Sequence, residues 1–174
     1  MKIALVLVSA FMLANGCKTQ QQVSNETSET SENTEQENTM EDNVIITLNK
    51  NSSYEIMNDE FGNSYINKKE GDMYVFEYKI TKSAPEGVAD GIYSESIMFQ
   101  FKEDMLPLSL TNEDLSNVNL VTSKLCKCRD GGFFKVTNGN LSASKTGNDL
   151  VVAINFNVEG LNQELNVINT SVEF

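Results

Sequence analysis

The sequence predicts an all-β fold, an antiparallel β-sandwich or small β-barrel of about eight strands, preceded by a disordered tether. Apolar and polar residues alternate with period two through most of residues 43–174, as expected for strands with one buried face. The alternating runs are separated by short stretches rich in Gly, Asn and Pro, which favour turns. Many short strands at regular spacing are typical of sandwiches and barrels. The length of this region suits one domain with a single core.

Two strands are clearest, residues 73–80 and 92–102. The loop SAPEGVADG lies between them, and its proline and glycines predict that the two strands form a long hairpin. The residues expected to face inward alternate along both strands and are Tyr74, Phe76, Tyr78, Ile80, Ile97, Phe99 and Phe101.

The C-terminal third predicts three more strands, at residues 133–145, 150–158 and 164–174. Gly147-Asn148 between the first two is a two-residue hairpin signal. The inward residues of the middle strand are Leu150, Val152, Ile154, Phe156 and Val158. Shorter strands are expected at residues 44–48, 65–67, 105–110 and 118–126. The one helical signal, a capping-box pattern from Thr111 to Asp114, predicts only a turn or two of helix.

The N-terminus predicts a secretory signal peptide over residues 1–16. Lys2 precedes an apolar run from Ile3 to Leu13, which is shorter than the roughly 20 residues that span a bilayer. Because a cysteine follows, the segment resembles a bacterial lipoprotein signal, in which the cysteine is acylated and becomes the new N-terminus. The usual pattern is Leu, two small residues and Cys. Leu13 here lies four residues before Cys17, and Asn15 interrupts the small pair.

Residues 17–42 are predicted to form a lipidated cysteine followed by a disordered acidic tether. The segment is dominated by Ser, Thr, Asn, Gln and Glu and has almost no apolar residues, so it cannot bury enough surface to offset the entropy of ordering. An acidic binding tail is the alternative interpretation. Acyl chains on Cys17 would anchor the protein stably in a lipid bilayer, because two chains suffice for that. The predicted organisation is thus 1–16 signal peptide, 17–42 anchor and tether, and 43–174 a single β domain.

The net charge limits the choice of partner. The chain has 13 basic and 25 acidic residues, a formal charge of −12. Nucleic-acid binding requires a basic surface, so no nucleic-acid partner is expected. The charge permits cationic partners but does not demand them.

One region of the domain resembles known proteins. The segment FKVTNGNLSASK, a turn and LVVAINFNV is similar to the β-meander of uncharacterised small β-rich lipoproteins of the Bacteroidota, and the Asn-rich, Lys-rich composition agrees with this. The resemblance implies architecture only, because fold does not determine function. It also implies an outer-membrane location. Lys18-Thr19-Gln20 after the cysteine favours the periplasmic face over the cell surface, where acidic residues often follow the cysteine.

Few catalytic chemistries remain open. The chain has no histidine, which excludes Ser-His-Asp and Cys-His arrangements and imidazole-bound metals. A carboxylate pair of the glycosidase kind survives as an option, but the sequence cannot pair its acids, such as Asp59, Glu60, Asp90, Glu95 and Asp104. Residues 58–63 are rich in oxygen ligands without the spacing of a calcium loop, and we expect a turn there. We therefore expect no enzyme activity, no cofactor and no metal.

Cys126-Lys127-Cys128 is the most specific local feature. Residues i and i+2 of a strand lie about 6.5 Å apart, at the long end of disulfide geometry, so a bridge fits best where the strand ends. We expect a structural role for Cys126 and Cys128, as a disulfide or as two buried thiols. A thiol-redox or soft-metal role and an intermolecular disulfide are the alternatives, and Lys127 and Arg129 would favour a reactive thiolate.

The function expected from these observations is noncatalytic. A membrane-anchored envelope lipoprotein would use its β domain to bind a protein, glycan or small ligand. The alternative is an acidic inhibitor of a cationic enzyme such as lysozyme. One structural observation separates a ligand cavity from a partner surface: whether a set of inward side chains fills the interior or lines a void above roughly 300 Å³. These side chains are Phe76, Phe99, Phe101, Ile154 and Phe156.

Overall fold

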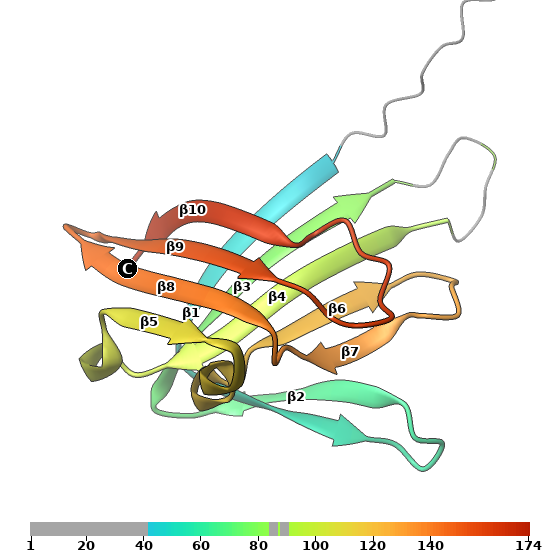
Figure 1. The fold of residues 1–174 in the computed structure, drawn as a ribbon, viewed down its shortest axis with the longest axis horizontal. Helices are drawn as coiled ribbons and strands as arrows, with labels where there is room; N and C mark the ends of the chain where they lie inside the picture. The colour runs from blue at the N-terminus through green and yellow to red at the C-terminus, as the bar shows by residue number, and fades with distance from the viewer. Residues whose placement is uncertain (1–41, 84–86, 88–90) are drawn as a thin grey trace, which may run out of the picture. The chain divides into compact units, whose positions relative to one another are not determined.

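Ten strands in two antiparallel sheets make up the described part of the chain, which confirms the predicted all-β class (Figure 1). The computed structural model describes residues 42–83, 87 and 91–174, all within the unit Asn38–Phe174. The predictions for the signal peptide, Cys17 and nearly all of the tether therefore lie outside the described residues. Among the described residues, no helix has the length and apolarity needed to cross a bilayer.

The larger sheet has six strands, and their spatial order differs from their order in the chain. From edge to edge they are β2 (Ser64–Glu70), β1 (Asp42–Asn58), β3 (Met73–Lys82), β4 (Tyr93–Phe101), β6 (Val121–Leu125) and β7 (Gly132–Lys135). The strands β3 and β4 form the predicted long hairpin, with Tyr74 opposite Phe101 and Lys82 opposite Tyr93.

The smaller sheet has four strands in the order β10 (Val167–Glu173), β9 (Asp149–Phe156), β8 (Gly139–Thr146) and β5 (Leu108–Thr111). Gly147 and Asn148 connect β8 to β9 as predicted. Two 3₁₀ helices, η1 (Glu103–Met105) and η2 (Asn112–Val118), flank β5. Thr111 holds the N-cap position of η2 but makes no capping hydrogen bond through its side chain, so the capping-box prediction is wrong on that point.

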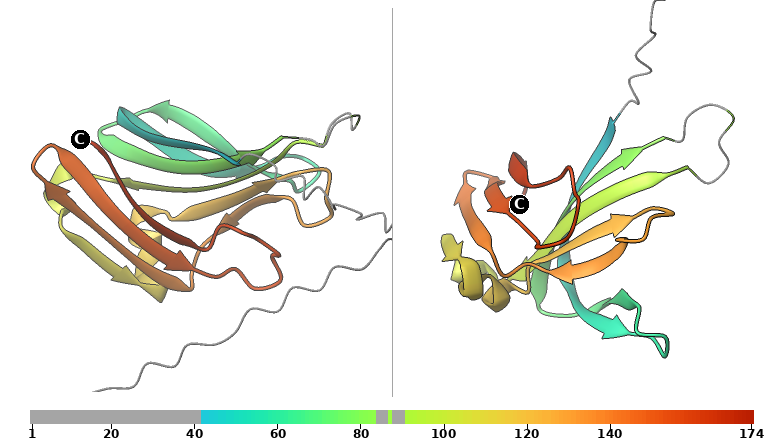
Figure 2. Two further views of the ribbon diagram at one scale, coloured as in Figure 1. Left: turned by 90° about the horizontal axis from the view of Figure 1, so that it is seen from above. Right: turned by 45° about the vertical axis from the view of Figure 1, so that its right-hand side comes forward.

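The two sheets pack face to face as a sandwich, seen as two layers in the left view of Figure 2. The main core lies between them and joins aromatic residues of β3 and β4 to aliphatic residues of β8 and β9. The five side chains named above as the test of a cavity are fully buried and fill this interior, with exposures between 0% and 2%. The sandwich interior is a packed core.

The predicted strand over residues 133–145 is wrong as a single element. It is two strands, β7 and β8, that belong to different sheets. The chain crosses between the layers at Val136, which is buried, and Gly139 starts β8 with φ of 147°. A Cβ on Gly139 would lie 2.3 Å from the Asn155 carbonyl oxygen, so this crossing requires glycine.

Five other strands were also predicted with wrong bounds. The expected short strands at 44–48 and 65–67 are parts of β1 and β2, which are longer and pair with each other over residues 52–58 and 64–70. The expected strands at 105–110 and 118–126 begin only at Leu108 and Val121, because η1 and η2 take up the residues before them. The expected strand at 164–174 begins only at Val167.

A bulge in β1 bends the larger sheet. Between Asn49 and Ser52, β1 carries two residues opposite one of β3, and Asn51 adopts a positive φ of 51°. The extra residue reverses which side chains of β1 face the core. Before the bulge Leu48 packs into the main core, whereas Tyr54 after it packs on the opposite face of the sheet.

The sheet curls so far that its edge strands β2 and β7 approach within 8 Å between Cα atoms. Tyr54 joins the two sides of the curl, because its hydroxyl lies 3.1 Å from the Met98 carbonyl oxygen on β4 and 2.6 Å from that of Asn119. Its backbone N–H donates to the Gln100 side chain at 2.9 Å. Burial, with a smaller contribution from Glu77, raises the pKa of Tyr54, so the hydroxyl keeps its proton as a donor.

Replacing Tyr54 with Phe should lower the free energy of unfolding by about 1–3 kcal/mol, because the Met98 and Asn119 carbonyls lose the one hydroxyl proton that they share. Urea unfolding measures this effect. Tyr65→Phe is the matched control, since Tyr65 is exposed on β2 and its hydroxyl has no partner among the described residues; it should change stability by less than about 0.5 kcal/mol. Equal effects of the two substitutions would contradict the role given to Tyr54.

Candidate functional site

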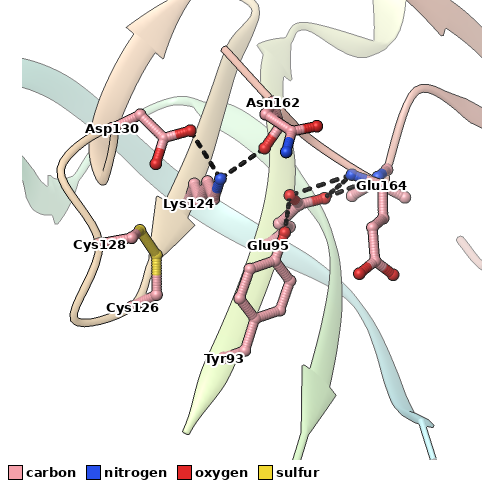
Figure 3. Close-up of polar contacts among 9 residues, drawn as sticks. Tyr93, Glu95, Lys124, Cys126, Cys128, Asp130, Asn162 and Glu164 are labelled. Atoms are coloured by element: carbon pink, nitrogen blue, oxygen red, sulfur yellow. Dashed lines mark hydrogen bonds and ion pairs between the residues drawn. A yellow bond between two sulfur atoms is a disulfide. The ribbon is translucent and has the colours of Figure 1, made fainter. Parts of the chain in front are cut away.

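A buried polar cluster lies at the end of the larger sheet near the cysteines (Figure 3). At its centre is Glu95 of β4, which is 1% exposed and points toward the smaller sheet's side of β4, like Ile97 and Phe99. Its carboxylate accepts hydrogen bonds from the backbone N–H groups of Glu164, at 3.0 and 3.1 Å, and Leu165, at 2.6 Å. It also accepts one from the Tyr93 hydroxyl. Both oxygens of the carboxylate therefore accept hydrogen bonds from the protein.

Lys124 of β6 stands opposite Glu95 in the strand register and is also buried. Its ammonium donates to the Asp130 carboxylate at 2.7 Å and to the Asn162 carbonyl. It lies 5.9 Å from the centre of the Tyr93 ring, at the limit of a cation–π contact. The hydrogen bond from Lys124 holds the pKa of Asp130 below its usual range, so the carboxylate is ionised at neutral pH.

The cluster binds the β9–β10 connection, residues 157–166, to the larger sheet. Glu95 contacts this connection at Glu164 and Leu165, and Lys124 contacts it at Asn162. Burial, followed by the hydrogen bond to Glu95, raises the pKa of Tyr93, which therefore remains a donor. Each buried charge has hydrogen-bonding partners, which is the arrangement expected of a structural network.

Cys126 and Cys128 form a disulfide in the loop just after β6, with Cα atoms 5.2 Å apart. The distance is shorter than along a regular strand because β6 ends at Leu125. Gly131 lies against this loop, where an added Cβ would be 3.2 Å from the Lys124 carbonyl oxygen and 3.6 Å from Cys128 Sγ. The disulfide therefore closes a tight turn beside the buried cluster (Figure 3).

The described acids that were considered for a carboxylate pair lie in three different parts of the fold. Asp59 and Glu60 lie in the β1–β2 turn, Glu95 in β4 and Asp104 in η1, while Asp90 lies outside the described residues. Within ranges 42–83 and 91–174, no three Asp, Glu or Cys residues gather closely enough to hold a metal ion. The predicted turn at residues 58–63 is present. The Asn63 side-chain amide donates to the Asp59 carboxylate at 2.9 Å and is the main cause of a lowered Asp59 pKa. The backbone N–H groups of Asn63, at 2.7 Å, and Phe61, at 2.9 Å, lower this pKa further.

A groove of about 390 Å³ lies on the other face of the larger sheet, away from the main core. The curl of the sheet forms it, because β2 and β7 rise on either side of β3, β4 and β6. Four apolar side chains line it, from four strands: Ile66, Met98, Leu125 and Phe133. A small second core beneath, including Tyr54, Val75 and Val121, supports the groove. The volume falls within the range of small-molecule sites.

Polar groups occupy one part of the same groove. Lys68 and Glu77 form an ion pair across it at 2.8 Å. The hydroxyls of Ser96 and Ser123 lie 2.7 Å apart, with either able to donate. Lys79 also lines the groove, directly opposite Ser96 in the register of β3 and β4. The mixture of an apolar surface with a few converging polar groups is characteristic of a binding site.

The groove residues do not stand out in the sequence, because they lie on the strand face that alternation assigns to solvent. One signal was available in β4. The run SESIMFQF is buried on both faces from Ser94 to Phe99, and its Met98 interrupts an otherwise polar face. A strand covered on both faces indicates a second packed surface.

Comparison with known proteins found no matching family model, no matching curated protein and no matching solved structure.

Replacing Glu95 with Gln should lower the free energy of unfolding by about 2–4 kcal/mol, because the carboxylate accepts hydrogen bonds at both oxygens, from Glu164 and Leu165 at Oε2 and from Tyr93 and Glu164 at Oε1, whereas an amide has one neutral accepting oxygen. Amide hydrogen exchange at Glu164 and Leu165 should accelerate. Glu55→Gln is the matched control, since Glu55 forms an exposed ion pair with Lys69, and it should cost less than about 1 kcal/mol. Unchanged exchange at Glu164 and Leu165 would contradict a role for Glu95 in holding the β9–β10 connection.

Proposed function

We propose that the chain is a bacterial envelope lipoprotein whose β domain binds a partner or ligand in the groove, without catalysis. The observation that carries this proposal is the contrast between the two faces of the larger sheet. The face toward the smaller sheet is closed by a filled core, whereas the opposite face forms an open groove with both apolar and charged lining. Evolved proteins rarely leave apolar surface in such a concave site without a use for it.

Catalysis by the buried cluster is disfavoured by its hydrogen bonding. A general acid or base must reach the substrate proton directly or through one water. Glu95 is buried and its oxygens are taken by backbone N–H groups and Tyr93. Lys124 likewise donates to two protein oxygens. In the proposed function, Glu95 and Lys124 stabilise the fold and take no part in a reaction.

The anchor is proposed from the sequence of residues 1–17, which resembles a lipoprotein signal ending at Cys17. Lys18-Thr19-Gln20 after the cysteine supports an outer-membrane position facing the periplasm. A groove in an anchored domain would meet lipids, glycans and proteins of the envelope at high local concentration.

The alternative is an acidic inhibitor of a cationic enzyme, and one observation favours it. Phe61 is 81% exposed at the end of the β1–β2 hairpin, next to the acids Asp59 and Glu60. The hydrogen bonds to Asp59 order this turn, so little entropy would be lost when Phe61 enters a pocket rimmed by cations.

Replacing Cys17 with Ser should release the protein from the membrane fraction, because no acyl chain can then be attached. Fractionation before and after a high-salt wash measures this, and Lys18→Ser is the control that should remain bound. A Cys17→Ser protein that stays in the membrane at high salt would refute the proposed anchor.

Replacing Leu125 with Lys should abolish capture of the partner, because a charged side chain would enter the groove. Val151→Lys is the matched control: Val151 is 42% exposed on β9, outside the groove, and Leu125 is 44% exposed. The anchored proteins are purified from their own envelope, and co-purifying proteins and lipids are quantified.

If both lysine variants still capture the partner, the groove is not the binding site. A third variant, Phe61→Ser, separates the two functions. If the Phe61→Ser protein no longer captures the partner while the Leu125→Lys protein still does, the result supports the inhibitor function instead.

A further inference from the structure

The groove contains a cation whose charge is not balanced by the described part of the chain. Lys68, on the opposite side, is paired with Glu77 at 2.8 Å. Lys79 is half-buried and lines the same groove, and its ammonium group has no ion pair or hydrogen bond among residues 42–83 and 91–174. The lining thus carries two cations and one anion, a net charge that favours an anionic ligand at Lys79.

A hydroxyl donor stands beside Lys79. The Ser96 and Ser123 hydroxyls carry two protons, and the 2.7 Å contact between them uses one. The proton of the accepting hydroxyl is free to turn toward a ligand. Since Ser96 lies opposite Lys79 on the neighbouring strand, the groove offers an ammonium and a hydroxyl within one cross-strand spacing. Two donors at this separation suit the two oxygens of a carboxylate.

Apolar side chains lie on the β7 side of the hydroxyl pair. Phe133 of β7 stands opposite Ser123, which places an aromatic ring next to the pair. Leu125 of β6 lines the same side of the groove. Met98 of β4 lies on the other side of the hydroxyl pair. A ligand with its anionic group at Lys79 would therefore meet apolar surface at Phe133 and Leu125.

We propose that the groove binds a single-chain alkyl carboxylate, of the fatty-acid class. The carboxylate contacts Lys79 and the Ser96–Ser123 hydroxyl pair, and the alkyl chain lies along Leu125 and Phe133. This assignment rests on the proposed binding function and adds the chemistry of the ligand. The volume of about 390 Å³ favours a medium-length chain over a diacyl lipid.

The test is a titration of the full-length chain carrying Cys17→Ser, which avoids detergent, with sodium decanoate below its micellar concentration. Isothermal titration calorimetry measures affinity. Decanoate should bind at least tenfold more tightly than decanol, which has the same alkyl chain and no charge. Octanoate should bind more weakly than decanoate by about fourfold for each methylene removed, the effect of losing a buried CH₂.

Two lysine variants test the head-group contact. Lys79→Gln should weaken decanoate at least tenfold and leave decanol unchanged, and Lys79→Arg should retain most of the decanoate affinity. Lys145→Gln is the matched control on the smaller sheet, with the same change of charge, and should affect neither ligand. Equal urea midpoints for the variants show that folding is intact.

The proposal is overturned if decanoate does not bind, if decanol binds as tightly, or if Lys79→Gln leaves decanoate affinity unchanged. Its failure is distinguishable from failure of the proposed function. If decanoate does not bind but Leu125→Lys still abolishes partner capture, the groove is a binding site for another chemistry. If Leu125→Lys also has no effect on capture, the groove itself is not the site.

Discussion

The hydroxyl of Tyr54 contacts two backbone carbonyls, at Met98 and Asn119, that lie 44 and 65 residues away in the chain. This contact exists only because the bulge before Ser52 turns β1 and reverses the faces of its side chains. A sheet without the bulge would present Tyr54 to the main core, and its second face would lie open. The groove, the small second core and the approach of β2 to β7 all depend on this local bend closed by one buried hydroxyl.

The polar groups on the two faces of the larger sheet differ in how many protein partners they have. Toward the smaller sheet, Glu95 and Lys124 are buried and have several protein partners each, so they stabilise one arrangement of the β9–β10 connection. On the groove face, Lys79 stands with a hydroxyl pair beside apolar side chains and has no described partner. A buried charge without a partner is costly, whereas a half-buried one can be hydrated until a ligand replaces the water. The first arrangement suits a scaffold and the second suits a binding site.

Period-two alternation predicted the central strands well, because β3, β4 and β9 each have a face that must be buried. Leu150, Val152, Ile154 and Phe156 are all buried as expected. Alternation failed at residues 133–145, since the pattern of Gly139, Leu141 and Ala143 extends back to Thr137 although the chain passes from one sheet to the other there. It also failed in β1, where polar residues around Asn51 concealed a strand that continues through a bulge. The groove was missed for a related reason: the residues on the second face are polar enough to be assigned to solvent.

The sequence by itself determined the fold class, because burying one face of a strand requires an apolar residue at every second position whatever the strand pairs with. It also determined the turn at Gly147-Asn148 and the absence of histidine chemistry, which are properties of single residues and their neighbours. Only the tertiary structure decided which strands share a sheet, that Glu95 and Lys124 meet the β9–β10 connection, and that Lys79, Ser96 and Ser123 come together in a groove. These are contacts between residues far apart in the chain. They depend on the curl of a whole sheet, to which no local pattern of residues corresponds.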